Sequence, residues 1–285
     1  MTLLDALTLG IVQGIAEFLP ISSSGHLIIA RDLLGIQTDH GLAVDAVLQL
    51  ATVLAVIIYF RDDLVSIMRG LFRRVRGSDE GQGMMTLVSA LIVGTIPAVA
   101  AGFLLEHHME TLFRNAHLVA WVLLAGSALF ALAEYSAYRR TRSRIGIDPV
   151  PLTDTTADRY ASISVMHGFV IGVFQTLALV PGMSRSGATI SGGMLVGLPR
   201  EQAARFAFLL SIPIILGSGA KKLIELGHTP LGPTEWHLIA LATGVAFLTG
   251  LATIHYLLRF LRQHTLVPFI VYRVLLALCV LLYLA

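Results

Sequence analysis

One stretch decides how this chain folds, and it reads Gln13-Gly14-Ile15-Ala16-Glu17-Phe18-Leu19-Pro20-Ile21-Ser22-Ser23-Ser24-Gly25-His26. Pro20 ends a helix because it lacks a backbone N–H and clashes with the preceding turn. The serines after it favour a new helix start, since their hydroxyls accept hydrogen bonds from free backbone N–H groups. The stretch therefore predicts a helix over 3–19, a break, and a second helix over 22–34. Such a break is tolerated at membrane depth only where it is buried in protein or lines a watery cavity.

A second stretch repeats this plan in the other half of the chain, and it reads Gln175-Thr176-Leu177-Ala178-Leu179-Val180-Pro181-Gly182-Met183-Ser184-Arg185-Ser186-Gly187. Four residue pairs match at one constant offset: Gln13 with Gln175, Ser22 with Ser184, Ser24 with Ser186 and Gly25 with Gly187. The change that matters for chemistry is Ser23 to Arg185. This stretch predicts a second broken pair of helices, over 162–180 and 184–198. Broken helices at corresponding positions of two halves indicate a binding site within a membrane protein.

The composition excludes an ordinary soluble domain. Of the 285 residues, 55% are hydrophobic and only 13% are charged, whereas charged residues make up about a quarter of a soluble protein. Several apolar runs approach the ~20 residues that span a bilayer. The single cysteine, Cys279, excludes a disulfide framework. No basic segment precedes the first apolar run, so we expect no cleaved signal peptide. The sequence predicts an all-α polytopic membrane protein that binds no nucleic acid.

Three transmembrane helices are expected after each broken pair. In the first half they cover 42–60, 84–105 and 118–138, and in the second half they cover 203–220, 238–260 and 267–284. We therefore expect two repeats, each a re-entrant hairpin plus three spans: residues 1–144 and 161–285, joined by a polar, proline-containing cytoplasmic linker over 145–160.

Arginine positions predict the orientation of these repeats. Basic loops are expected after Phe60 and after Tyr138, and their arginines are Arg61, Arg69, Arg73, Arg74, Arg76, Arg139, Arg140, Arg142 and Arg144. Because arginine-rich loops lie in the cytoplasm, both loops are placed there. The first hairpin then opens to the outside and the second to the cytoplasm. The two repeats have opposite orientations, which is an inverted-topology arrangement.

Several side chains in the two stretches are suited to phosphate chemistry. Gln13 and Glu17 are four residues apart and share a helix face, whereas Ser23 and His26 are three apart and share a face of the next helix. If the two breaks meet, these groups converge with Arg185 and two helix N-termini. Helix N-termini bind phosphate through free N–H groups and the positive end of the dipole. Arginine adds a bidentate contact. This set indicates a phosphorylated ligand at the lipid boundary, with a divalent cation on Glu17.

Other interpretations stay open from the residues alone. The serines and Gly25 are also compatible with close helix packing, and Glu17 with Arg185 is compatible with a buried ion pair that only joins the repeats. Asp45 and Gln49 have a spacing that faces the same cavity, although Asp45 also suits an interfacial position. Arg273 is a second phosphate ligand or a snorkelling anchor.

Two motifs resemble a known family. Gln13-x-x-x-Glu17-Phe-Leu-Pro-x-Ser-Ser-x-Gly-His26 and Pro181-Gly-x-Ser184-Arg185-Ser-Gly-Ala-Thr189 are similar to the two signature motifs of the undecaprenyl-pyrophosphate phosphatase, or bacitracin-resistance, family. The similarity extends to Asp45-x-x-x-Gln49 and Pro268-Phe-x-x-Tyr272-Arg273. The resemblance implies hydrolysis of the C55 lipid undecaprenyl pyrophosphate in the bacterial plasma membrane. It also implies a site on the outer side and a requirement for Mg²⁺ or Ca²⁺.

The resemblance also implies roles for individual residues. It gives Gln13 and Glu17 to the metal and catalytic motif, with Ser22, Ser23 and His26 beside them. It gives Ser184, Arg185 and Thr189 to the phosphate-binding motif, to which we add Ser186 and Arg273 as phosphate ligands. The family has a glutamate or a glutamine at the position of Gln13. Here the glutamine removes one carboxylate, so a metal would rely on Glu17, substrate oxygens and water.

The nucleophile is predicted from position. Ser23 starts a helix, where the dipole favours a developing alkoxide, and His26 is expected to take its proton or to protonate the leaving phosphate. Ser22, Ser184 and a water molecule are rival nucleophiles. Two other functions stay open: a polyprenyl-phosphate flippase and a non-catalytic lipid-binding protein. The expected partners are the C55 diphosphate lipid and the bilayer. The oligomeric state is open, with a homodimer as one alternative.

Overall fold

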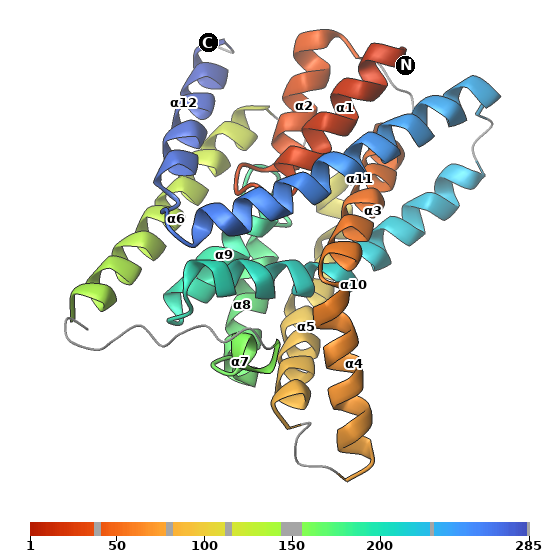
Figure 1. Cartoon of the computed structure of the whole chain (residues 1–285). Coiled ribbons are helices and arrows are strands. Elements are labelled where there is room, and N and C mark those ends of the chain that lie inside the picture. The colour runs from red at the N-terminus through yellow and green to blue at the C-terminus, as the bar shows by residue number, and fades with distance from the viewer. Residues whose placement is uncertain (37–40, 78–81, 112–115, 144–155, 229–230, 284–285) are drawn as a thin grey trace.

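The computed structural model describes residues 1–36, 41–77, 82–111, 116–143, 156–228 and 231–283, which form helices and short connecting turns without a strand (Figure 1). The helices are α1 (Leu3–Ala16), α2 (Ser23–Leu34), α3 (Gly41–Tyr59), α4 (Arg61–Val75), α5 (Gln82–Thr111), α6 (Ala116–Ser143), α7 (Thr156–Tyr160), α8 (Val165–Leu177), α9 (Arg185–Leu195), α10 (Arg200–Gly227), α11 (Pro233–Leu261) and α12 (Val267–Tyr283). Both predicted broken pairs are present, as α1 with α2 and α8 with α9. The all-α prediction is confirmed.

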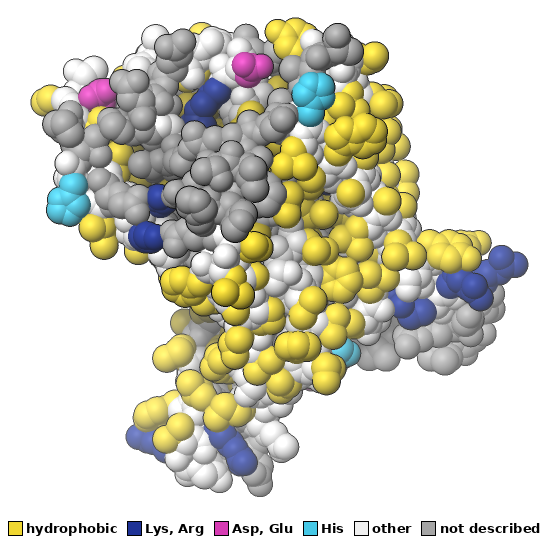
Figure 2. All heavy atoms as spheres, turned by 180° about the vertical axis from the view of Figure 1, so that it is seen from behind, with side chains coloured by type: hydrophobic (Ala, Val, Ile, Leu, Met, Phe, Trp, Pro, Cys, Tyr) yellow, Lys and Arg dark blue, Asp and Glu magenta, His cyan; other side chains and the backbone are white. Residues whose placement is uncertain are grey.

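Four helical stretches are long and apolar enough to cross a membrane: Gln82–Leu105, His117–Arg142, Arg200–Ile224 and Pro233–Leu261. Helices α3 and α4 pass the same criteria together, as one stretch bent by 68°. Helices α1, α8 and α12 are apolar but shorter. Figure 2 shows apolar side chains over the middle of the visible face, with Lys and Arg side chains at two projecting ends. The prediction of a polytopic membrane protein is confirmed.

The basic segment after Phe60 is a helix, α4, and the prediction of a loop there was wrong. Asp62 and Asp63 lie in its first turn and Arg73 and Arg74 in its last, which is the charge order that the helix dipole favours. The abundance of arginine concealed an amphipathic pattern. Ile67 and Gly70 are buried against the molecule while the arginines point outward.

The two first helices of the broken pairs pack in the same way on different partners. Helix α1 lies on α11, and a Cβ at Gly10 would come within 2.5 Å of the Ala242 carbonyl oxygen. Helix α8 lies on α5, and a Cβ at Gly172 would come within 2.1 Å of the Gly94 carbonyl oxygen. Gly10 and Gly172 precede the two stretches, each by three residues. Small residues therefore let both helix pairs approach backbone to backbone, as is common within membranes.

The expected linker lies mostly outside the described residues, which resume at α7. Its last turn is held by the buried carboxylate of Asp63, which accepts hydrogen bonds from Thr156, Arg159 and Tyr160, each at 3.0 Å. Burial raises the pKa of the Tyr160 hydroxyl, so this group stays protonated and donates. The end of the linker is thereby fixed to the start of α4.

Polar contacts of α6 connect it to the end of α9 and to the segments that follow. The Arg140 guanidinium from α6 donates to the carbonyl oxygens of Met194 and Leu195 at the C-terminal end of α9. The Glu134 carboxylate, six residues before Arg140 on α6, accepts from Arg200 at 2.9 and 2.5 Å and from the backbone N–H of Leu266 at 2.7 Å. The second broken pair is thus held against α6, α10 and the start of α12.

Candidate active site

The two serine turns have the same backbone geometry. Ser22 and Ser184 have φ values of 77° and 74°, and they are the only non-glycine residues with positive φ in the part of the chain that the structure describes. Each side chain caps its helix, with Ser22 Oγ accepting from the Gly25 N–H at 3.4 Å and Ser184 Oγ accepting from the Gly187 N–H at 3.2 Å. Such a backbone costs about 1–3 kcal/mol and is found mostly at functional sites.

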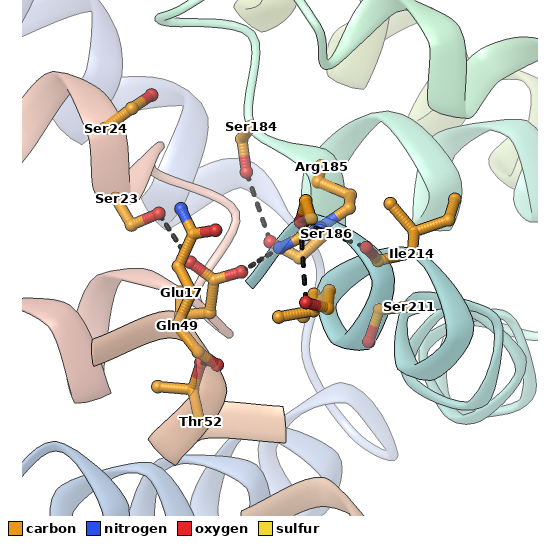
Figure 3. Close-up of polar contacts among 12 residues, drawn as sticks. Glu17, Ser23, Ser24, Gln49, Thr52, Ser184, Arg185, Ser186, Ser211 and Ile214 are labelled. Carbon is orange, nitrogen blue, oxygen red and sulfur yellow. Dashed lines mark hydrogen bonds and ion pairs between the residues drawn. The ribbon is translucent and has the colours of Figure 1, made fainter. Parts of the chain in front are cut away.

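A single carboxylate joins the two turns (Figure 3). Glu17 lies just after α1 and is 8% exposed. Its Oε2 accepts hydrogen bonds from Ser23 Oγ at 2.6 Å and from Gln13 Nε2 at 3.0 Å. Its Oε1 forms an ion pair with Arg185 Nη2. The structure therefore brings together Gln13, Glu17, Ser23 and Arg185, four of the predicted site residues, from both halves of the chain.

The hydroxyls of the second turn support this junction. Ser186 Oγ donates to the Leu19 carbonyl at 3.1 Å and lies 3.1 Å from Ser184 Oγ, so α9 is tied to the break in the first half. Thr189 Oγ1 donates to the Arg185 carbonyl of its own helix at 2.7 Å. A small cavity beneath the ion pair is lined by Glu17, Phe18, Arg185, Ser186, Thr189 and Ser211. These predicted phosphate ligands are close to the junction.

His26 does not contact Ser23 in this structure. Its Nδ1 lies 2.7 Å from the Ser22 carbonyl oxygen and its Nε2 lies 2.6 Å from the hydroxyl of Tyr272, whose ring stacks on the imidazole. Because a carbonyl only accepts, the assigned tautomer has its hydrogen on Nδ1, and Tyr272 donates to Nε2. Ser23 starts α2 and its side chain reaches back across the break to Glu17. The base beside the predicted nucleophile is therefore a carboxylate rather than the imidazole.

Arg273 supports the second turn from beneath. It is fully buried, lies over the Phe130 ring at 4.7 Å, and donates from Nη2 to the carbonyl oxygens of Gly182 at 2.9 Å and Leu123 at 3.1 Å. Its Nε donates to Ser127 Oγ at 3.3 Å. With no exposed surface it does not snorkel, and it contacts the turn before Ser184 rather than the Glu17–Arg185 pair.

Three polar residues that the predicted site did not include lie around the ion pair. Figure 3 shows Gln49 and Thr52 of α3 and Ser211 of α10 beside Glu17 and Arg185. Such residues can be recognised in the sequence as polar side chains within apolar helices. On this basis Gln49 had been considered as a residue facing the same cavity. Asp45, considered with it, instead pairs with Arg31 of α2, with Nη1 2.6 Å from Oδ2.

The described residues do not form a preassembled metal site. Among them, no three or more His, Cys, Asp or Glu side chains are grouped to hold an ion. Glu17 is the one carboxylate at the junction, and both of its oxygens accept hydrogen bonds. Gln13 Oε1 is a further oxygen at the junction, and it is buried without a hydrogen-bond partner among the described residues. A cation on Glu17 Oε1 would lie next to the Arg185 guanidinium, which pairs with the same oxygen.

Comparisons with known proteins agree on one family. A sequence model described as "Bacitracin resistance protein BacA" matches residues 6–279. Proteins named undecaprenyl-diphosphatase are similar to this chain over nearly its whole length. The one from Hahella chejuensis is 39% identical, with 97% of this chain and 96% of the relative covered. Those from Myxococcus xanthus and Thermobifida fusca are 41% and 39% identical, covering 96% and 99% of this chain and 86% and 90% of the relatives. The chain belongs to the bacitracin resistance protein BacA family.

Proposed function

We propose that this protein is an undecaprenyl-diphosphatase, which hydrolyses undecaprenyl pyrophosphate to undecaprenyl phosphate and inorganic phosphate. The observation that carries the proposal is the contact of one buried carboxylate with Ser23 and Arg185 at the meeting point of two helix N-termini. Ionisable groups are costly inside a membrane and are usually functional there. The names of relatives that are 39% and 41% identical over most of their length support the same activity.

The diphosphate is proposed to bind between the N-termini of α2 and α9. Arg185 supplies a planar fork that matches two phosphate oxygens. Ser22, Ser184 and Ser186 supply hydroxyls, and the first turns of both helices supply backbone N–H groups. Phosphoryl transfer depends mainly on such positioning and charge stabilisation. Arg273 is proposed to act indirectly: it donates a hydrogen bond to the Gly182 carbonyl and so positions the second turn, without contacting the phosphate itself.

Ser23 is proposed as the nucleophile and Glu17 as its base. Ser23 Oγ attacks the terminal phosphorus, its proton passes to Glu17 Oε2, and the bond from phosphorus to the bridging oxygen breaks, so that undecaprenyl phosphate leaves. Water then attacks the phosphoserine, inorganic phosphate is released, and Glu17 returns the proton to the serine oxygen. Gln13 orients Glu17 throughout. Water as the direct nucleophile, with Ser23 only binding phosphate, is the alternative route.

His26 is proposed to stabilise the first turn and to protonate the leaving phosphate. The first role uses the contact of Nδ1 with the Ser22 carbonyl. The second role requires a protonated imidazole, in which Nε2–H donates to the Tyr272 hydroxyl and Nδ1–H turns from the Ser22 carbonyl to the leaving phosphate. The transfer leaves a neutral ring, which takes a proton from solvent before the next turnover.

The inverted topology, with residues 1–144 and 161–285 as the repeats, is likewise a proposal. It is supported by matching packing, since α1 lies on α11 of the other half and α8 lies on α5 of the first half. We place the site on the outer side of the bacterial plasma membrane. Cysteines at the exposed positions Asp32 and Arg76, in a Cys279→Ser background, test this with a membrane-impermeant maleimide. Labelling of the first alone is expected, and labelling of the second alone would reverse the orientation.

The activity is tested by measuring inorganic phosphate released from a C55 or shorter prenyl diphosphate by the purified protein. The flippase alternative is favoured by the matching backbone of the two turns, because paired broken helices are also a transporter feature. Ser23→Ala separates the two functions: it removes hydrolysis but leaves transport of a polyprenyl phosphate between the leaflets of a vesicle. A homodimer is proposed as the oligomeric state. Measuring the mass of the detergent-solubilised protein tests it.

A further inference from the structure

Arg185 has two incompatible tasks at the site. In the structure its Nη2 is paired with Glu17 Oε1. In the proposed function the same guanidinium binds a substrate phosphate. A divalent cation placed on Oε1 would face the positive charge of Arg185 at short range in a poorly hydrated site, where like charges repel strongly. As long as Arg185 is paired with Glu17, its positive charge therefore disfavours metal binding to this carboxylate.

The other contacts of Glu17 show what changes when Arg185 leaves its carboxylate. Oε2 keeps its hydrogen bonds from Ser23 and Gln13 when Arg185 leaves, so the contact between the nucleophile and its base is undisturbed. Oε1 becomes free. Gln13 Oε1 is a fully buried acceptor without a partner among the described residues, and its own amide nitrogen already contacts Glu17. A buried acceptor left unpaired costs free energy, and a cation beside Glu17 removes that cost.

We propose that the site assembles by an exchange of partners: a diphosphate takes Arg185 from Glu17, and the released Glu17 Oε1, with Gln13 Oε1, takes the divalent cation that accompanies the diphosphate. This inference rests on the proposed function, because it assigns the order in which that site fills. The cation does not bind first. Arg185 keeps the protein from holding a metal in the absence of a diphosphate.

The test measures metal binding directly, with Mn²⁺ titrated into the purified full-length protein and free Mn²⁺ followed by electron paramagnetic resonance. The wild type is expected to bind Mn²⁺ alone weakly. Arg185→Gln is expected to bind Mn²⁺ alone about tenfold more tightly or better, because Glu17 is no longer paired and a buried carboxylate without its partner is strongly unfavourable. The double variant Glu17→Gln/Arg185→Gln is expected to lose this gain.

Arg140→Gln is the matched control. It removes the same charge from the opposite end of α9, where Arg140 contacts backbone carbonyls and Ser136 rather than a carboxylate. Its affinity for Mn²⁺ should equal that of the wild type. An equal gain in this control would attribute the effect to net charge and overturn the proposal. So would a wild type that binds Mn²⁺ alone as tightly as Arg185→Gln.

A second measurement needs no variant that might misfold. The preformed complex of Mn²⁺ with methylenediphosphonate, a non-hydrolysable pyrophosphate analogue, is titrated into wild-type protein. It should bind at least about tenfold more tightly than Mn²⁺ alone, in line with ordinary coupling between two ligands. Equal affinities would overturn the exchange. The proposed function fails separately, by an absence of phosphate release from a prenyl diphosphate.

Discussion

The two serine turns share a backbone but not a chemistry. Both begin with a serine at positive φ that caps the following helix. The next residue is Ser23 in the first turn and Arg185 in the second, and the two side chains reach the same carboxylate, one at Oε2 and the other at Oε1. The repeated plan brings the first residues of two helices to one carboxylate. The one-residue difference then puts the proposed nucleophile on one side of Glu17 and the proposed phosphate ligand on the other.

A second difference concerns the two matching glutamines. Gln13 donates to Glu17, whereas the place that corresponds to Glu17 in the second half is occupied by Leu179. Both polar atoms of Gln175 are consequently buried without a partner among the described residues. In the first half the glutamine amide nitrogen has a carboxylate partner, whereas in the second half the glutamine has none among the described residues. The proposed function accordingly assigns catalysis to the first turn and phosphate binding to the second.

The largest effect is expected from the Ser23–Glu17 contact. Ser23→Ala and Glu17→Gln should each lower kcat by about 10²–10⁴-fold, the range for loss of a positioned base or nucleophile. The double variant should be little worse than either single one, because groups that act as a unit are not additive. Phosphate-release kinetics measure this. Losses that multiply would assign the two residues separate roles and favour water as the nucleophile.

Arg185→Lys tests the second turn with the charge kept. Lysine lacks the planar fork that contacts two phosphate oxygens, so we expect kcat/KM to fall by about 10²-fold, the equivalent of losing one or two charge-assisted hydrogen bonds. The matched change is Arg140→Lys on α6, whose guanidinium contacts the C-terminal end of α9; this variant should stay near the wild-type rate. An Arg185→Lys enzyme of near wild-type efficiency would remove Arg185 from the substrate site.

Tyr272→Phe tests the role of His26, which only the first turn has and which Tyr272 contacts. The change removes the hydrogen bond to His26 Nε2 and keeps the stacked ring. One hydrogen bond of about 1 kcal/mol corresponds to a decrease in kcat of roughly fivefold. The KM should stay constant, since Tyr272 does not contact the proposed phosphate site. A change in KM with an unchanged kcat would instead place Tyr272 in substrate binding.

Gln175→Leu is expected to have the smallest effect and the opposite sign. It replaces a buried amide without partners by an apolar side chain of similar size, which should stabilise the protein by about 1 kcal/mol. Thermal unfolding in detergent measures this, and activity should be retained. The matched change Gln13→Leu should lower activity, because Glu17 loses a donor. Loss of activity in Gln175→Leu would show that the second turn binds a ligand through this amide.

The sequence by itself determined the helical membrane class, both breaks and most helix positions. These follow from local properties: apolar runs of bilayer length, Pro20 and Pro181 as helix breakers, and serines that cap the next helix. The repeated stretches also identified Gln13, Glu17, Ser23 and Arg185 as site residues. The α4 helix was missed because its many arginines concealed the regular spacing of its few buried residues.

Only the tertiary structure decided which of these groups touch. Spacing along one helix paired Ser23 with His26, but the direction of a side chain at a helix start depends on what lies across the break, and there Ser23 meets Glu17. Arg185 reaches Glu17 over a separation of 168 residues, and Tyr272 reaches His26 over 246. Such contacts depend on how α1, α9 and α12 pack. Local periodicity places a residue on a helix face, whereas the partner that occupies the opposite face is set by the packing of the whole chain.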